Sequence, residues 1–328
     1  MTEEKLFYKY QSLEIVKDEN GKDRQYTIEN LSNNQLYFQH PKGYNDPYDS
    51  MIRYYRERTE EASINKLMKE RGFSKNEAIE IIEDYIREGI IKRDGDLLIT
   101  ECHGRDDFPL PLTCCFSKES GNILMWSHYA NYHKGVCLCF KAKLIEGYPH
   151  LTINSKAARL YPIFYEKTPP SPINFNNQNE EMDKFSAFLS TKSKHWEYEQ
   201  EHRMFLTEKD TIENLNKFEK EELEGVILGI RINSIDASQI YETINEHYLK
   251  KGVNVNFYVE EVDLGQYKVQ PKKIDIKTHI IKIVEKEKLH NEIKRRKRIN
   301  SDISTLYVGS QESWFININP TFRRCTQM

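Results

Sequence analysis

Residues 109–141 constrain the fold most, because two short apolar runs flank a segment with helical periodicity. The runs LTCCFS and GVCLCF have the length and the β-favouring composition of strands. Between them, Ile123, Trp126 and Ala130 recur at helical spacing, and Gly135 suits the left-handed residue that ends a helix. The pattern predicts a strand–helix–strand unit.

The rest of the chain also alternates between strand and helix patterns. Strands are expected at 5–12, 35–39, 158–167, 202–207, 224–232 and 253–263, and helices just before Asn33 and at 180–195, 210–224, 235–252 and 282–302. We therefore predict an α+β fold, in which a mixed, mostly antiparallel central sheet carries flanking helices.

Two segments stand apart from this sheet pattern. From 52 to 93 the apolar residues follow a 3.6-residue period, which predicts a helical insertion. In it, Ser74 and Glu77 have the spacing of a capping box. We expect a single domain at 1–265 and a C-terminal extension at 266–328 with a basic helix. Its basic run suits nucleic-acid phosphates, but a solvated arm or an oligomer contact explains it equally well.

Composition excludes several classes of protein. The net charge of −3 gives no general attraction to nucleic acid or to anionic membranes. The N-terminus has no secretion pattern, and no apolar run approaches the roughly 18–20 residues of a membrane span. The six cysteines lack zinc-ligand spacing and resemble buried small hydrophobes, so we expect a cytoplasmic protein with no bound metal and no membrane contact.

The segment KSKHWEYEQEHRMFL (192–206) concentrates acidic and aromatic residues. A helix ending near Trp196 and a strand starting by His202 would place the triplet Glu-Gln-Glu at their junction. A carboxylate there can point into a cleft. We predict Glu201 as the working carboxylate, Glu199 as its partner or rival, and Arg203 as the residue that orients it.

Hydroxyl and histidine groups elsewhere add candidates. Ser117 and Ser127 are suitable substrate-binding hydroxyls, but nothing local marks either as an activated nucleophile. His128 and His133 lie five residues apart, which a helix does not place on one face, so they are not a two-histidine metal pair.

Several motifs occur in succession along the chain. They are LFYKYQSL, NNQLYFQHPKGYNDPYDS, CCFSKESGNILMWSHYANYHKGVCLCF, LYPIFYEK, KSKHWEYEQEHRMFL and EGVILGIRIN. In this order they resemble the bacterial domain-of-unknown-function family 2971 over roughly residues 5–235. That family name implies no activity.

A second resemblance, to ADP-ribosyltransferases, implies a chemistry. Those enzymes use an aromatic residue, His or Arg on a first strand, a Ser or Tyr on a middle strand, and a Glu-x-Glu or Gln-x-Glu turn. Tyr8-Lys9-Tyr10, Ser117 or Ser127, and Glu199-Gln200-Glu201 would fill these places. The resemblance implies a split central sheet and NAD as co-substrate, with Tyr10, Tyr129 or Tyr132 stacked on nicotinamide. By comparison with transferase toxins, it also implies a toxin or phage-defence effector with a nucleic-acid or protein acceptor and a partner or regulator protein.

Two other classes remain open from the residues alone. A metal-dependent hydrolase or nuclease would use Asp46 and Asp49 with the Glu199/Glu201 pair. A non-enzymatic sensor would bind a nucleotide-like ligand in a cleft of Tyr, Trp and His side chains. The candidate catalytic residues are Glu201, Glu199, Ser117 and Ser127, and the candidate ligand-binding residues are Tyr8, Lys9, Tyr10, Asn45, Asp46, Trp126, His128, Tyr129, Trp196 and Arg203.

Overall fold

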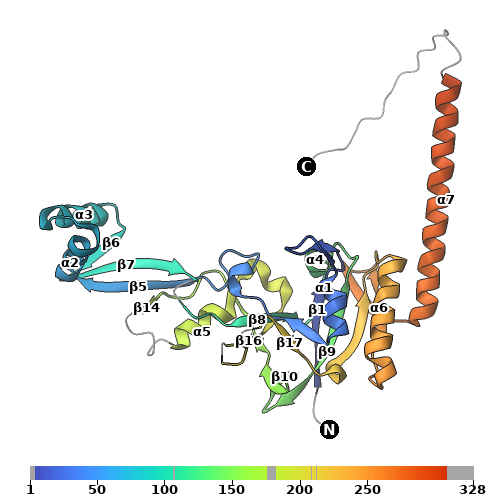
Figure 1. Ribbon diagram of the computed structural model, residues 1–328, viewed down its shortest axis with the longest axis horizontal. Coiled ribbons are helices and arrows are strands. Elements are labelled where there is room, and N and C mark those ends of the chain that lie inside the picture. Colours follow the sequence, from blue (N-terminus) through green and yellow to red (C-terminus); the bar gives the residue numbers. More distant parts are fainter. Residues whose placement is uncertain (1–3, 106–107, 176–181, 208, 212, 309–328) are drawn as a thin grey trace. The chain divides into compact units, whose positions relative to one another are not determined.

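The computed structural model describes residues 4–105, 108–175, 182–207, 209–211 and 213–308 (Figure 1). The chain divides into two units, Met1–Ile276 and Lys277–Met328. The first unit contains a ten-stranded sheet, several smaller sheets and flanking helices, so the predicted α+β fold is confirmed.

The central sheet has the strand order β12-β16-β8-β1-β9-β18-β19-β20, and the β10–β11 hairpin extends from β9. Its pairings are antiparallel except for the parallel pair β18–β19. The strands are β1 (Glu4–Gln11), β8 (Leu112–Ser117), β9 (Val136–Ile145), β10 (Tyr148–Ile153), β11 (Lys156–Arg159), β12 (Tyr161–Pro162), β16 (Glu201–Leu206), β18 (Leu223–Leu228), β19 (Asn256–Asp263) and β20 (Lys268–Lys273).

The remaining elements form small sheets and helices around it. The small sheets pair β2 (Val16–Lys17) with β3 (Asp23–Arg24), β4 (Gln35–Tyr37) with β17 (Leu215–Lys217), β13 (Phe164–Glu166) with β15 (Thr191–Ser193), and β14 (Ile173–Asn174) with β5 (Ile52–Thr59), β7 (Leu97–Gly104) and β6 (Ile91–Asp94). The helices are α1 (Tyr26–Ser32), α2 (Glu60–Arg71), α3 (Lys75–Arg87), α4 (Ile123–Tyr129), α5 (Met182–Ser190), α6 (Ser234–His247) and α7 (Ile276–Val308), with 3-10 turns η1 (Pro41–Gly43), η3 (Lys194–Glu199), η4 (Lys220–Glu222) and η5 (Leu249–Lys251).

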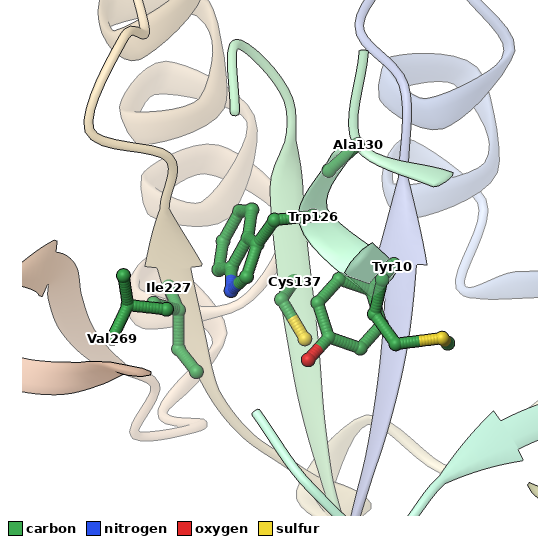
Figure 2. Close-up of a cluster of buried hydrophobic side chains, with 7 residues drawn as sticks. Tyr10, Trp126, Ala130, Cys137, Ile227 and Val269 are labelled. Atoms are coloured by element: carbon green, nitrogen blue, oxygen red, sulfur yellow. The ribbon is translucent and has the colours of Figure 1, made fainter. Parts of the chain in front are cut away.

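The predicted strand–helix–strand unit is β8, α4 and β9, but the predicted helix end at Gly135 is wrong, because α4 ends at Tyr129 with Ala130 as its C-cap. Asn122 caps α4 by accepting hydrogen bonds from the backbone N–H groups of Leu124 and Met125. Trp126 is fully buried, and Figure 2 shows it beside Tyr10 of β1, Cys137 of β9 and Ile227 of β18. The indole donates to the carbonyl of Ser120, so its polar atom is satisfied inside the core.

The central sheet opens between β1 and β8. These strands pair at a single position, Tyr8 with Ser117, whereas β1 pairs with β9 along its whole length. In the opening, the Lys9 ammonium donates to the carbonyl of Cys115 at 3.1 Å and lies 5.3 Å from the centre of the Phe116 ring. A side-chain cation thus spans the gap where the backbone ladder stops.

Some predicted elements differ from the structure. Ile52–Thr59, which we placed in the helical insertion, is strand β5, and the helices are α2 and α3 behind it. The two helices have a core of their own around Ile82, and the capping box of Ser74 is confirmed. The helical prediction extended too far toward the N-terminus because β5 directly adjoins α2.

The helix expected at 210–224 is wrong. Leu215–Lys217 forms β17 and pairs with β4, and Asn214 exchanges hydrogen bonds with the backbone of Phe38. Long-range pairing here overrides a helix-like charge pattern. The strand expected at 158–167 is divided among β11, β12 and β13, and 180–195 contains both α5 and β15.

The second unit contains most of α7. This helix includes the charged segment that we predicted at 282–302. Lys294 and Arg295 are exposed, and the side chains of the remaining basic run lie outside the described residues. Within the described part of the chain, every helix is too short or too polar to cross a membrane.

Candidate functional site

The opening between β1 and β8 contributes to a cavity of about 860 Å³. The loop that follows η1, the segment from β15 to β16, and residues of α1, β4, α4 and β17 also line it. It brings together the predicted residues Tyr8, Lys9, Tyr10, Asn45, Ser117, His128, Tyr129, Glu199, Glu201 and Arg203. Its volume lies in the usual range for small-molecule sites.

Three of these residues lie side by side on three neighbouring strands. Tyr8 on β1 is directly opposite Ser117 on β8, and Ser117 is directly opposite Glu201 on β16. Directly opposed residues of antiparallel strands share one face of a sheet. The aromatic residue, the serine and the glutamate that the sequence nominated therefore share one face.

Glu199 and Glu201 flank a left-handed residue. The 3-10 turn η3 ends at Glu199, Gln200 has φ 44° and ψ 48°, and β16 begins at Glu201. The predicted junction of helix and strand is thus a 3-10 turn followed by a strand. The reversal at Gln200 lets both carboxylates reach Lys192, whose Nζ lies 2.5 Å from Glu199 Oε2 and 3.2 Å from Glu201 Oε2.

Arg203 anchors the network from β16. Its Nε and Nη2 donate to the two oxygens of Glu201 at 2.6 and 3.0 Å, and Nη1 and Nη2 donate to the two oxygens of Asp49 at 2.8 and 2.5 Å. Nη1 also donates to the carbonyl of Leu189 at 3.1 Å. Such paired hydrogen bonds are the strong form of an arginine–carboxylate contact, and they use all five guanidinium donors.

Glu199 is held differently. Tyr129 donates to its Oε1 at 2.6 Å, and Asn45 donates to the Tyr129 hydroxyl at 3.2 Å. Lys192 binds the other oxygen. An ionised carboxylate can accept about four hydrogen bonds, so Glu199 has acceptor capacity left toward the cavity.

The two glutamates have opposite pKa shifts. Burial is the largest influence on Glu201 and would raise its pKa, but Arg203 and Lys192 together hold the pKa well below its ordinary value. For Glu199, burial prevails and raises the pKa although Lys192 opposes it. With opposite pKa shifts, Glu201 stays charged while Glu199 can bind and release a proton.

The buried network carries unequal charge. Its three carboxylates are Asp49, Glu199 and Glu201, and its two cations are Lys192 and Arg203, all of them nearly inaccessible to solvent. If all five are ionised, one negative charge remains uncompensated. A buried net charge is costly, so a proton on Glu199 or a positive charge in the cavity is favoured.

Other predicted residues lie away from the cavity. Trp126 is core, and Trp196 packs near Lys192, whose Nζ lies 4.9 Å from its ring centre. Asp46 accepts from the backbone N–H of Tyr48 and shapes its own loop. Ser127 instead lies 3.3 Å from His133, although the sequence had suggested no local activating group.

Three residues around the site, Lys192, Tyr44 and Arg105, were not among the predicted site residues. Lys192 appeared only as the first letter of the acidic segment, and Tyr44 places its ring 5.2 Å from the guanidinium of Arg203. Arg105 donates to the backbone carbonyls of Asp46, Pro47 and Asp49. No sequence pattern around Lys192 predicts its burial, because its partners Asp49 and Glu201 lie on other segments of the chain.

Within the described residues, no group of three or more His, Cys, Asp and Glu side chains has an arrangement suited to a metal ion. The acidic residues at the cavity are already engaged by Lys192 and Arg203. Their geometry therefore suits ion pairing within the protein rather than the open carboxylate cluster of a magnesium site.

Comparison with known proteins gives one match. Residues 125–204 match the family described as "Protein of unknown function (DUF2971)", which confirms this resemblance over that segment. The segment includes α4 from Met125 onward, and Lys192, Glu199, Glu201 and Arg203. No curated protein and no solved structure matches the chain. Nothing in these comparisons points to ADP-ribosyltransferases, and that resemblance stays a prediction.

Proposed function

We propose that the cavity binds NAD and cleaves its nicotinamide–ribose bond, as an ADP-ribosyltransferase-like enzyme. The observation that carries the proposal is the buried network of three carboxylates and two cations on the cavity wall. Nicotinamide in NAD is a cationic ring, and its departure leaves a cationic ribosyl centre. Glu199, the carboxylate of this network in excess of Lys192 and Arg203, would attract both when it is ionised.

Cleavage of the nicotinamide–ribose bond requires stabilisation of the positive charge that develops on the ribosyl group. The electron pair of the C–N bond leaves with nicotinamide, which becomes neutral, and the positive charge passes to the ribosyl carbon and ring oxygen. A carboxylate fixed beside that carbon stabilises the developing charge. Water or a nucleophile of an acceptor molecule then forms the new bond and loses its proton.

We assign the ligand-facing role to Glu199 rather than to Glu201, which the sequence favoured. Arg203 and Lys192 already bind both oxygens of Glu201, which suits a fixed charge. Glu199 has acceptor positions free for a ribose hydroxyl, and the ligand cation would replace the proton that burial favours there.

The remaining wall suits the other parts of a dinucleotide. Lys9 offers positive charge for the diphosphate, and Ser117 lies beside Glu201 on the next strand. Tyr26 and Tyr37 line the cavity and are about half exposed, so they offer rings on which a base can stack.

The test measures binding and turnover separately. We expect NAD to raise the melting temperature, and chromatography to detect nicotinamide release. Glu199→Gln should reduce release by roughly 10²–10³-fold, the usual effect of removing one electrostatic stabiliser of a transition state. Lys250→Met is the control, because Lys250 forms an exposed ion pair on α6 and the following turn.

Each outcome separates the candidate functions. If NAD raises the melting temperature but no nicotinamide is released, the protein is a nucleotide-binding sensor and not an NAD-cleaving enzyme. If NAD causes neither stabilisation nor release, alone or with nucleic-acid and protein acceptors, the proposal is refuted. Incorporation of labelled ADP-ribose into an acceptor would identify the transferase and its target.

A further inference from the structure

A second polar network lies on the other side of α4. Ser127 Oγ is 3.3 Å from His133 Nε2, and His133 Nδ1 is 2.5 Å from Glu260 Oε1 on β19. A separate cavity of about 540 Å³ is lined by His133 and Glu260, and Ser127, which is not itself a lining residue, adjoins it through its contact with His133. A hydroxyl, an imidazole and a carboxylate in this order have the mutual geometry of an activated nucleophile.

The carboxylate is positioned to orient the imidazole. Glu260 is 2% exposed, and its second oxygen accepts the backbone N–H of Ile230 at 2.9 Å. The contact with Glu260 favours a proton on Nδ1 of His133. Nε2 is then the acceptor that faces Ser127.

The backbone around the histidine is strained. Asn131, Tyr132 and His133 have φ values of 46°, 54° and 66°, so three successive non-glycine residues are left-handed. Such conformations cost free energy and occur preferentially at functional sites. The carbonyl of His133 accepts the backbone N–H of Arg231 at 2.9 Å, which holds the turn against the end of β18.

The imidazole is held on its face as well. The His133 ring stacks on Trp126, with ring centres 6.1 Å apart and an angle of 10° between the planes. Trp126 is fully buried. The histidine is therefore fixed by its ring face, by one ring nitrogen and by its backbone, as a catalytic base must be.

We propose that Ser127, His133 and Glu260 form a second catalytic site, which hydrolyses carboxylic esters. The cavity walls indicate the substrate class. Ile123, Ile230, Val262 and Leu264 supply apolar surface for an acyl group. Arg231 and Lys268 line the same cavity, together with Asp263, and supply positive charge for the oxyanion.

The reaction would proceed in two balanced steps. The Ser127 hydroxyl, which donates to the carbonyl of Ile123 in the structure, turns its proton toward His133. Oγ attacks the ester carbonyl, His133 takes the proton and gives it to the departing alkoxide, and an acyl-serine remains. Water then attacks the acyl group, and His133 returns a proton to Oγ as the carboxylic acid leaves.

The experiment uses the full chain with a fluorophosphonate probe and p-nitrophenyl butyrate. We expect fluoride displacement and a phosphonate on Ser127 in peptide mass spectra, together with ester hydrolysis. Ser127→Ala should lose the label, and His133→Gln should slow hydrolysis by at least about 10²-fold. Glu260→Gln should slow hydrolysis and change its pH profile.

Ser238→Ala is the matched control. Ser238 also lies in a helix and donates to the carbonyl four residues before it, at 2.7 Å, as Ser127 does at 2.8 Å. It should keep full labelling and hydrolysis. An unlabelled wild-type chain, a label on another serine, or unchanged hydrolysis in Ser127→Ala would overturn the proposal. Circular dichroism of Ser127→Ala confirms that a loss of label is not a loss of fold. The NAD assays address the other cavity and stand or fall separately.

Discussion

Glu199 and Glu201 differ by two positions in the chain, yet isosteric replacement of each should have very different effects on stability. Both side chains are almost inaccessible, and both contact Lys192. Glu201 additionally binds Arg203 through both oxygens. Gln keeps the shape and removes the charge, so the pair Glu199→Gln and Glu201→Gln isolates what each charge contributes.

The structure sets the magnitudes. Glu201→Gln leaves the guanidinium of Arg203, 1% exposed, with only Asp49 as a charged partner. Breaking one side of a buried ion pair costs about 3–5 kcal/mol, which corresponds to a fall in melting temperature of roughly 6–20 °C in a unit of this size. Glu199→Gln removes one charged bond and also the excess negative charge. We expect a change of about 1 kcal/mol or less in the free energy of unfolding.

The pH dependence has opposite signs at the two positions. The pKa of Glu201 is lowered from its ordinary 4.5, so its stabilisation is present above that pH and is lost as pH falls toward the folded-state value. The pKa of Glu199 is raised above 4.5, so the wild-type chain loses stability as pH rises through the folded-state value. Glu199→Gln should lack that loss.

Urea unfolding followed by circular dichroism between pH 3 and pH 8 measures both effects. The deficit of Glu201→Gln should be largest near neutral pH and should shrink in acid. Equal destabilisation by the two variants at neutral pH, or a larger one for Glu199→Gln, would refute the reasoning from the ion network. Lys250→Met should show no resolvable change in the same assay, because its partner contact is exposed.

Two further predictions concern the backbone around the cavities. Gly229→Ala should destabilise the chain by about 1–3 kcal/mol in urea unfolding, because a Cβ there would lie 2.2 Å from the carbonyl oxygen of His133; a neutral result would contradict the close packing of that turn. Arg105→Leu should cost about 1–3 kcal/mol and weaken NAD binding in a thermal-shift titration, because Arg105 holds the carbonyls of the loop that carries Asp49; unchanged NAD affinity would show that this loop does not shape the site.

The sequence predicted the elements that carry strong local patterns. The unit of β8, α4 and β9 was expected because apolar runs bracket a segment with helical spacing, although neither cap of α4 was predicted. The acidic segment was expected to meet a strand starting by His202, and β16 begins one residue earlier, at Glu201. These features depend on residues close together in the chain, so a single sequence contains them.

The parts that escaped prediction depend on distant contacts. Leu215–Lys217 has a helix-like context but pairs with β4, about 180 residues earlier in the chain. The residues next to Lys192 in the sequence do not predict that it is buried. Its burial follows from contacts with Asp49, Glu199 and Glu201, which the fold brings together. Strands β1 and β8 pair at a single position, which leaves the opening at the cavity, and no sequence pattern in either strand predicts this.

The short helix α4 connects the two candidate sites physically. Its residues Met125, His128 and Tyr129 face the larger cavity, while Ile123 lines the smaller one and Ser127 contacts His133. Trp126 lies in the core and stacks on His133, so it fixes the helix and the imidazole together. A ligand that displaces Tyr129 from Glu199 would therefore act on the same helix that positions Ser127. The seven residues of α4 therefore contribute side chains to both cavities.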